Sequence, residues 1–129
     1  MKLLTREWAE KAENDFKVAT QILRRRKEIV PDAACFFCQQ CVEKYLKARL
    51  VESDIPFPRS HDLLQLLKLC TQVEPLWSAY ADIVDAMTDF AVDFRYPGHS
   101  ATLRQAKLAL KHCRSLRAEV RRSLGCKSK

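Results

Sequence analysis

Hydrophobic and polar residues recur along this chain with the spacing of amphipathic helices, most clearly between residues 33 and 52. On a helical wheel at about 100° per residue, the apolar residues of this stretch fill about half of the circumference. They are Ala34, Phe37, Cys38, Cys41, Val42, Tyr45, Leu46 and Ala48, and the other side carries Gln39, Gln40, Glu43, Lys44 and Lys47. So wide an apolar arc exceeds what a single neighbouring helix would cover. The pattern predicts a central helix with Asp32 as its N-cap.

Two residues depart from the pattern of this helix. Arg49 lies within the apolar arc near the C-terminal end. Its stem can lie along apolar surface with the charged head in water, or its guanidinium can point into a pocket that holds an anion or a carboxylate. Phe36 projects from the polar side, which makes it a candidate contact with another subunit.

A first helix is expected from Thr5, as its N-cap, to about Lys27. Its core face comprises Trp8, Ala12, Phe16, Ala19 and Leu23. Asp15, at the margin of this face, is either a solvated acid or the partner of a buried arginine. The four cations at 24–27 suit the negative end of a helix dipole, an interpretation that we favour over an RNA-binding patch.

Three further helices are expected after the central one. Pro56 and Pro58 impose an extended link, after which Ser60 caps a short helix over residues 61–70 with His61 in its first turn. Pro75 opens a fourth helix that carries six apolar side chains inward, namely Leu76, Tyr80, Ile83, Val84, Met87 and Phe90. Ser100 caps a last helix over 102–124, which has one apolar side and several basic positions, and residues 124–129 form a flexible tail.

The composition favours helices throughout. The chain has 129 residues, 47% of them hydrophobic, but only two glycines, whereas the turns of a sheet usually need more. We expect a single all-α domain over 1–129, an antiparallel up-and-down four-helix bundle with one additional short helix. No stretch is long and apolar enough for a membrane span, and the start becomes charged too soon for a signal peptide. We therefore expect a cytoplasmic protein with no membrane partner.

Charge and cysteine content narrow the possible partners. Lys and Arg outnumber Asp and Glu by 23 to 16, and the formal charge of +7 favours encounters with RNA, nucleotides or an acidic protein. The spacing of Cys35, Cys38 and Cys41 resembles part of a metal or iron–sulfur signature. On a helix, however, the first and third sulfurs stand about 9 Å apart along the axis. We expect reduced core cysteines, and neither a metal nor a cofactor.

The segment 93–99, Asp-Phe-Arg-Tyr-Pro-Gly-His, is the irregular stretch richest in groups that recognise ligands. Arg95 can bind a phosphate through two parallel hydrogen bonds, Tyr96 offers a stacking face, and His99 titrates near neutrality. A histidine and an arginine can also cleave RNA without a metal. The alternative is structural: Arg95 pairs with Asp93, or with Asp15, and only fixes the loop.

Four elements in this order resemble the HEPN domain family. They are W-x3-A-x2-D at Trp8, Ala12 and Asp15, the central ACFFCQQCVEKYLKA, then P-x-SHDLLQLL, and FRYPG before the last helix. The resemblance covers nearly the whole chain. It implies a helical bundle that forms a homodimer, works beside a minimal nucleotidyltransferase, and binds nucleotides or RNA.

One branch of that family consists of toxin RNases with an arginine and a histidine separated by four to six residues. Here three residues separate Arg95 from His99, and Pro97 and Gly98 are among them. That branch can also carry a tyrosine two places after the histidine, where this chain has Ala101.

The sequence thus predicts a non-catalytic, dimeric binding domain in a toxin–antitoxin-like pair, with a nucleotide or RNA held by Arg95 and Tyr96. Arg49 and Asp15 are further candidate binding residues. The alternative is a metal-independent endoribonuclease toxin that uses Arg95 and His99.

Overall fold

The computed structural model describes residues 1–91 and 93–127, and these form helices and no strand. The α-helices are α1 (Leu3–Arg24), α2 (Pro31–Glu52), α3 (Leu63–Cys70), α4 (Ala81–Thr88) and α5 (Leu103–Leu124). Short 3-10 helices flank α4, namely η1 (Pro75–Tyr80), η2 (Asp89–Ala91) and η3 (Asp93–Arg95). The all-helical prediction is confirmed for the described residues. Three helices have 22 residues and two have eight, in place of the expected four long helices and one short one.

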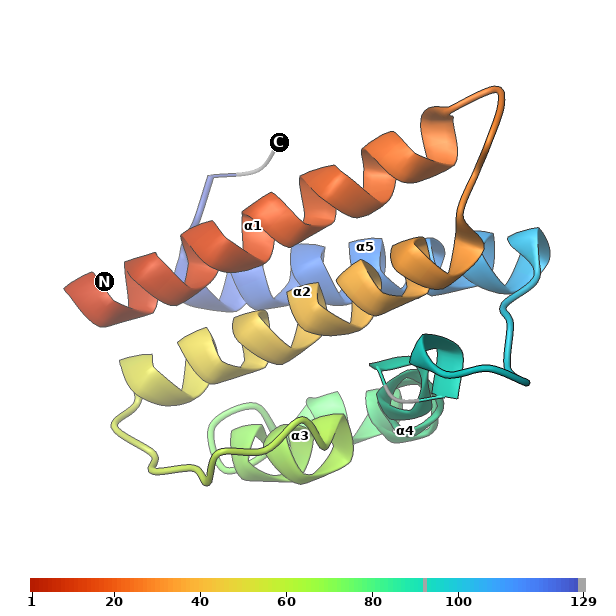
Figure 1. The fold of residues 1–129 in the computed structure, drawn as a ribbon. Coiled ribbons are helices and arrows are strands. Elements are labelled where there is room, and N and C mark those ends of the chain that lie inside the picture. The colour runs from red at the N-terminus through yellow and green to blue at the C-terminus, as the bar shows by residue number, and fades with distance from the viewer. Residues whose placement is uncertain (92, 128–129) are drawn as a thin grey trace.

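Helix α2 lies at the centre of the fold, as the width of its apolar arc predicts. It contacts α1, α3, α4 and α5, and also η2 and η3. In Figure 1, α1 lies above α2, α5 lies behind it, and α3 and α4 lie below. No helix in the described part of the chain is long and apolar enough to cross a membrane.

The predicted cap of the first helix is wrong, because Thr5 is engaged elsewhere. Its side chain is buried, and Oγ1 donates a hydrogen bond to Glu52 Oε1 at 2.9 Å. This bond ties the start of α1 to the end of α2. Helix α1 begins earlier, at Leu3, and ends at Arg24 instead of Lys27, with Glu28 in the link at a φ of 55°.

The cap of the central helix also differs from the prediction. Helix α2 follows Val30 and has Pro31 at its first position, where the missing N–H costs no hydrogen bond. Asp32 lies inside the first turn, and its Oδ1 accepts a hydrogen bond from the backbone N–H of Ala101 at 2.6 Å. The carboxylate therefore holds the start of α5 against the start of α2.

Two other predicted caps are displaced by two residues each. Ser60 accepts a hydrogen bond from the backbone N–H of Asp62, and the Asp62 carboxylate caps α3 by accepting from two backbone N–H groups, at 3.0 and 3.3 Å. His61 consequently precedes the helix. Likewise Thr102, and not Ser100, caps α5 in a reciprocal pair with Gln105.

The segment after Pro75 is a 3-10 helix before it becomes α4, which changes the side chains that face the core. Leu76, expected inside, is 86% exposed. Trp77 is buried in its place, and its Nε1 donates to Glu119 Oε2 at 2.8 Å. The tighter winding of a 3-10 helix rotates successive residues by about 120°, so a pattern assigned with α-helical spacing fails here.

Much of the polar side of α2 is buried. The Glu43 carboxylate, whose side chain is 4% exposed, lies 3.1 Å from Lys47 Nζ and 2.8 Å from His61 Nδ1. Gln39, fully buried, donates to the same carboxylate at 3.3 Å. Lys47 in turn lies 5.4 Å above the ring of Trp8 from α1. The charges on this side of α2 thus pair inside the protein.

A second, partly buried ion pair joins α1 to α5. Arg117 donates through Nε and Nη2 to the Glu13 carboxylate, with Nε 2.8 Å from Oε2. The Tyr45 hydroxyl of α2 also donates to Glu13. Burial alone would raise the pKa of Glu13, but the hydrogen bonds from Arg117 and Tyr45 outweigh it and lower the pKa.

Candidate functional site

The segment from η2 to Thr102 brings Arg95 to the N-terminal end of α2. Helix η3 ends at Arg95, and the chain then turns, with a hydrogen bond from the His99 N–H to the Tyr96 carbonyl at 3.4 Å. Gly98 has a φ of 92°, a conformation that favours glycine. The bond from Ala101 to Asp32 then attaches the segment to α2.

Arg95 lies against an aromatic surface and lines an open pocket. Its guanidinium carbon is 5.3 Å from the centre of the Phe36 ring, within the range of a cation–π contact. The Phe36 ring packs edge to face on Phe37, and Phe94 also lines the pocket. The pocket has a volume of about 420 Å³ and is lined by Val30, Asp32, Ala33, Phe36, Phe37, Phe94 and Arg95. We call it the Arg95 pocket.

The internal acids proposed as partners of Arg95 do not bind it. Asp15, 9% exposed, lies 2.6 Å from Lys44 Nζ through its Oδ2. Within residues 1–91 and 93–127, Arg95 forms no ion pair with Asp93 or any other carboxylate. The guanidinium therefore keeps hydrogen-bonding capacity for an anion in the pocket.

Tyr96 and His99 lie beside Arg95 in the same turn. Tyr96 is 62% exposed and His99 is exposed as well. Neither side chain forms a hydrogen bond or an ion pair in the part of the chain that the structure describes. Both are therefore available to a ligand that reaches Arg95.

The structure separates Arg49 from this group. It lies 13 residues after Phe36 on α2, or about 20 Å along the axis at 1.5 Å per residue. Its Nη1 donates to Ser53 Oγ at 3.0 Å, and its buried Nε has no hydrogen-bond partner. Asp15 likewise lies apart, in its pair with Lys44. The structure thus brings Arg95, Tyr96 and His99 together, and neither Arg49 nor Asp15 lines the Arg95 pocket.

Exposed cations surround the end of the molecule that holds the Arg95 pocket. The link between α1 and α2 begins with Arg25, Arg26 and Lys27, all exposed. In Figure 1 this link and the segment leading into α5 lie at the same end of the fold. Arg104, in the first turn of α5, is exposed there too. This concentration of positive charge favours an anionic ligand.

The aromatic side of the pocket was not predicted as part of a binding site. Phe36, an apolar residue on a polar helix side, was predicted only as a candidate contact with another subunit. Its actual neighbour, Arg95, is 59 positions further along the chain. No pattern within a single helix predicts a contact between residues so far apart in the sequence. The position of Phe36 on the polar side of its helix indicated only that this ring has a partner outside the helix.

In the described part of the chain, the cysteines do not gather into a metal site. Cys35, Cys38, Cys41, Cys70 and Cys113 are buried and free, and Cys126 is half-buried. Burial raises the pKa of the Cys35 and Cys70 thiols to about 12, so these sulfurs stay protonated at neutral pH. Among residues 1–91 and 93–127, no group of three or more His, Cys, Asp or Glu residues could hold a metal ion.

Comparison with known proteins identifies one family. The model of the HEPN domain matches residues 5–123, which is nearly the whole chain. Searches of curated proteins and of solved structures find no match.

Proposed function

Because the chain belongs to the HEPN domain family, we propose that it is a non-catalytic module that binds a nucleotide or RNA through the Arg95 pocket. Arg95 contacts a phosphate with its guanidinium, and Tyr96 stacks on a base or donates its hydroxyl. In this proposal the module is a homodimer and works with a minimal nucleotidyltransferase in a toxin–antitoxin-like pair.

One observation carries the binding proposal. The Arg95 guanidinium lies on the Phe36 ring beside a pocket of about 420 Å³ and forms no ion pair in the described residues. A guanidinium held against an aromatic face keeps its N–H edge free for two parallel hydrogen bonds to a phosphate. An arginine that only fixes a loop would instead have its own carboxylate. The exposed cations of the 25–30 link add attraction at longer range.

Replacing Arg95 with alanine should weaken the binding of ATP and of a short single-stranded RNA by at least about tenfold. The variant loses charge-assisted hydrogen bonds, each of which contributes about 1.5 to 3 kcal/mol. Fluorescence or calorimetric titration at low salt would measure the change, because phosphate contacts weaken as salt is added. The affinity of Arg95→Lys should lie between those of the wild type and Arg95→Ala, because lysine keeps the charge but lacks the planar pair of donors.

The matched control is Arg6→Ala, which removes another exposed arginine, from the start of α1, away from the link and its cations. It should bind like the wild type. Absence of binding by the wild type at low salt, or an equal loss in the two variants, would reject the Arg95 pocket as the site.

The endoribonuclease remains the second candidate function, favoured by the position of His99 on the same exposed turn as Arg95. Incubation of purified protein with RNA in EDTA separates the two functions. A binding module leaves the RNA intact. An RNase cleaves it, and His99→Ala abolishes the cleavage because the variant lacks the proton-transfer group. Cleavage that survives in His99→Ala would assign the activity to another group or to a contaminant.

A further inference from the structure

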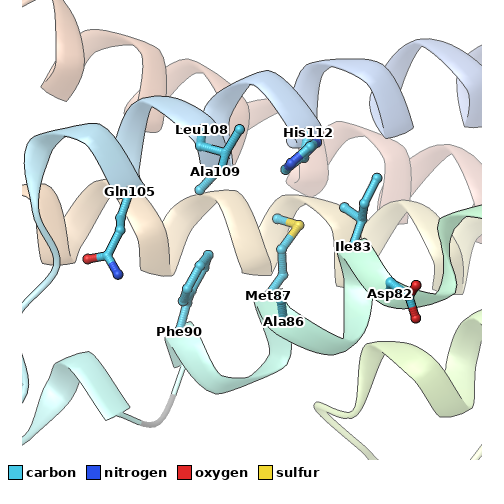
Figure 2. A pocket seen from close by; sticks show the side chains of 9 residues that line it. All are labelled: Asp82, Ile83, Ala86, Met87, Phe90, Gln105, Leu108, Ala109 and His112. Carbon is cyan, nitrogen blue, oxygen red and sulfur yellow. The ribbon is translucent and has the colours of Figure 1, made fainter.

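A groove between α4 and α5 is not used by the proposed binding site. Figure 2 shows Phe90, Met87 and Ile83 on the α4 side and Ala109 on the α5 side directed towards the space between the helices, with Leu108 beside them on α5. The volume is about 460 Å³, and most of the lining is apolar. Leu108, at its border, is 51% exposed. We call this surface the α4–α5 groove.

The two borders of the groove carry opposite charges. Along the α4 edge of the groove the exposed residues are acidic: Asp82, which also lines the groove, Asp85 and, at the start of η2, Asp89. On α5, beyond Leu108, the exposed residues are basic, namely Arg104, Lys107 and Lys111. In the described parts of the chain, none of these six charges forms an ion pair. The surface is thus an apolar strip with one acidic and one basic border, and the charges of both borders are unpaired within the described residues.

We propose that a second copy of this chain covers the α4–α5 groove, which gives the dimer of the proposed function a definite surface. A twofold interface uses the same patch on both copies, so the patch must be complementary to itself. With the twofold axis parallel to the groove, the acidic border of each copy faces the basic border of the other. An axis across the groove would place like charges together. The charge pattern therefore selects both the occupant and its orientation.

The groove also adjoins the Arg95 pocket. Phe90, which lines the groove, stacks on Phe94, which lines the pocket, with ring centres 5.2 Å apart and an angle of 22° between the planes. A copy seated in the groove fixes the Phe90 ring and, through it, one wall of the pocket. Dimer formation and ligand binding are thereby placed next to each other in each chain.

Leu108→Glu tests the surface, with the mass in solution as the readout. Sedimentation equilibrium or light scattering should give the mass of two chains for the wild type and the 14.9 kDa of one chain for the variant. A carboxylate at this position removes apolar contact, and its burial without a partner costs free energy. Leu4→Glu is the matched control, because Leu4 is 52% exposed on α1, away from the groove, and this variant should remain a dimer.

Charge reversal tests the orientation independently of Leu108. Asp85→Lys with Asp89→Lys makes both borders basic, and Arg104→Glu with Lys111→Glu makes both acidic. Each double variant should be monomeric, and the variant that combines all four changes should again be a dimer. Circular dichroism would establish that each variant keeps its helices.

A wild type that stays monomeric at high micromolar concentration would overturn the proposal, as would a folded Leu108→Glu that remains a dimer. The proposed binding function can fail separately. A wild-type dimer that responds to Leu108→Glu yet binds neither ATP nor RNA would reject the Arg95 pocket and leave this surface in place. Arg95→Ala should remain a dimer whether or not it binds ligand.

Discussion

Replacing Glu43 with alanine should lower the free energy of unfolding by about 4 kcal/mol, the range found when one partner of a buried ion pair is removed. The Glu43 side chain is 4% exposed, and that of Lys47, its partner at 3.1 Å, is 9% exposed. The variant would leave the Lys47 ammonium buried with no carboxylate, and Gln39 with one acceptor fewer. Urea denaturation at neutral pH would measure the loss.

Two comparisons separate the lost ion pair from a general effect of mutation. Glu10→Ala removes an exposed carboxylate from α1 and should change stability by less than about 0.5 kcal/mol. The double variant Glu43→Gln with Lys47→Met removes both charges, and should therefore be more stable than Glu43→Ala. A Glu43→Ala protein as stable as Glu10→Ala would show that the pair does not hold the fold together.

Replacing Glu13 with glutamine should lower the free energy of unfolding by about 2 to 3 kcal/mol at pH 7. The Arg117 side chain, 10% exposed, would lose its bidentate partner, and the Tyr45 hydroxyl its charged acceptor. The expected loss is smaller than for Glu43, because the Glu13 side chain is 22% exposed and its interactions are partly screened.

The loss in Glu13→Gln should also depend on pH. Because the pKa of Glu13 is lowered in the folded state, its carboxylate contributes stability above the unfolded pKa of about 4.3. That contribution disappears as the pH falls through the folded pKa. Urea denaturation at pH 7 and at pH 3 should thus show a large difference between wild type and variant at the higher pH and a smaller one at the lower. A difference that grows on acidification would contradict this account.

The interior of each long helix could be predicted from the sequence, because the apolar positions repeat with the helical period. The central position of α2 followed from the width of its apolar arc. The helix ends were less predictable, since several side chains compete for each cap. Thr5, a good N-cap by type, instead bonds to Glu52 from another helix, and Asp32 bonds to Ala101. Only the tertiary structure decides between these partners.

Only part of the candidate site could be predicted from the sequence. Arg95 and Tyr96 were identified because a polar, irregular segment interrupted the helical pattern. The Phe36 ring beneath Arg95 was not assigned, because no local pattern links positions 36 and 95. The burial of Glu43 was also unforeseen, since helical periodicity assigns a charged side to water unless its partners are known. Lys47 lies one turn further along the same helix, but His61 becomes a partner of Glu43 only when the link after α2 folds back along it.

The distribution of the six thiols has a practical consequence for spectroscopy. Five of them are buried in the core, and the remaining one, Cys126, is half-buried just beyond α5. A maleimide dye added to the folded protein therefore has one accessible position per chain. That position follows the C-terminal end of α5, whereas the Arg95 pocket lies near the N-terminal end of α5. A fluorophore on Cys126 would therefore detect the association of two chains without contacting the pocket.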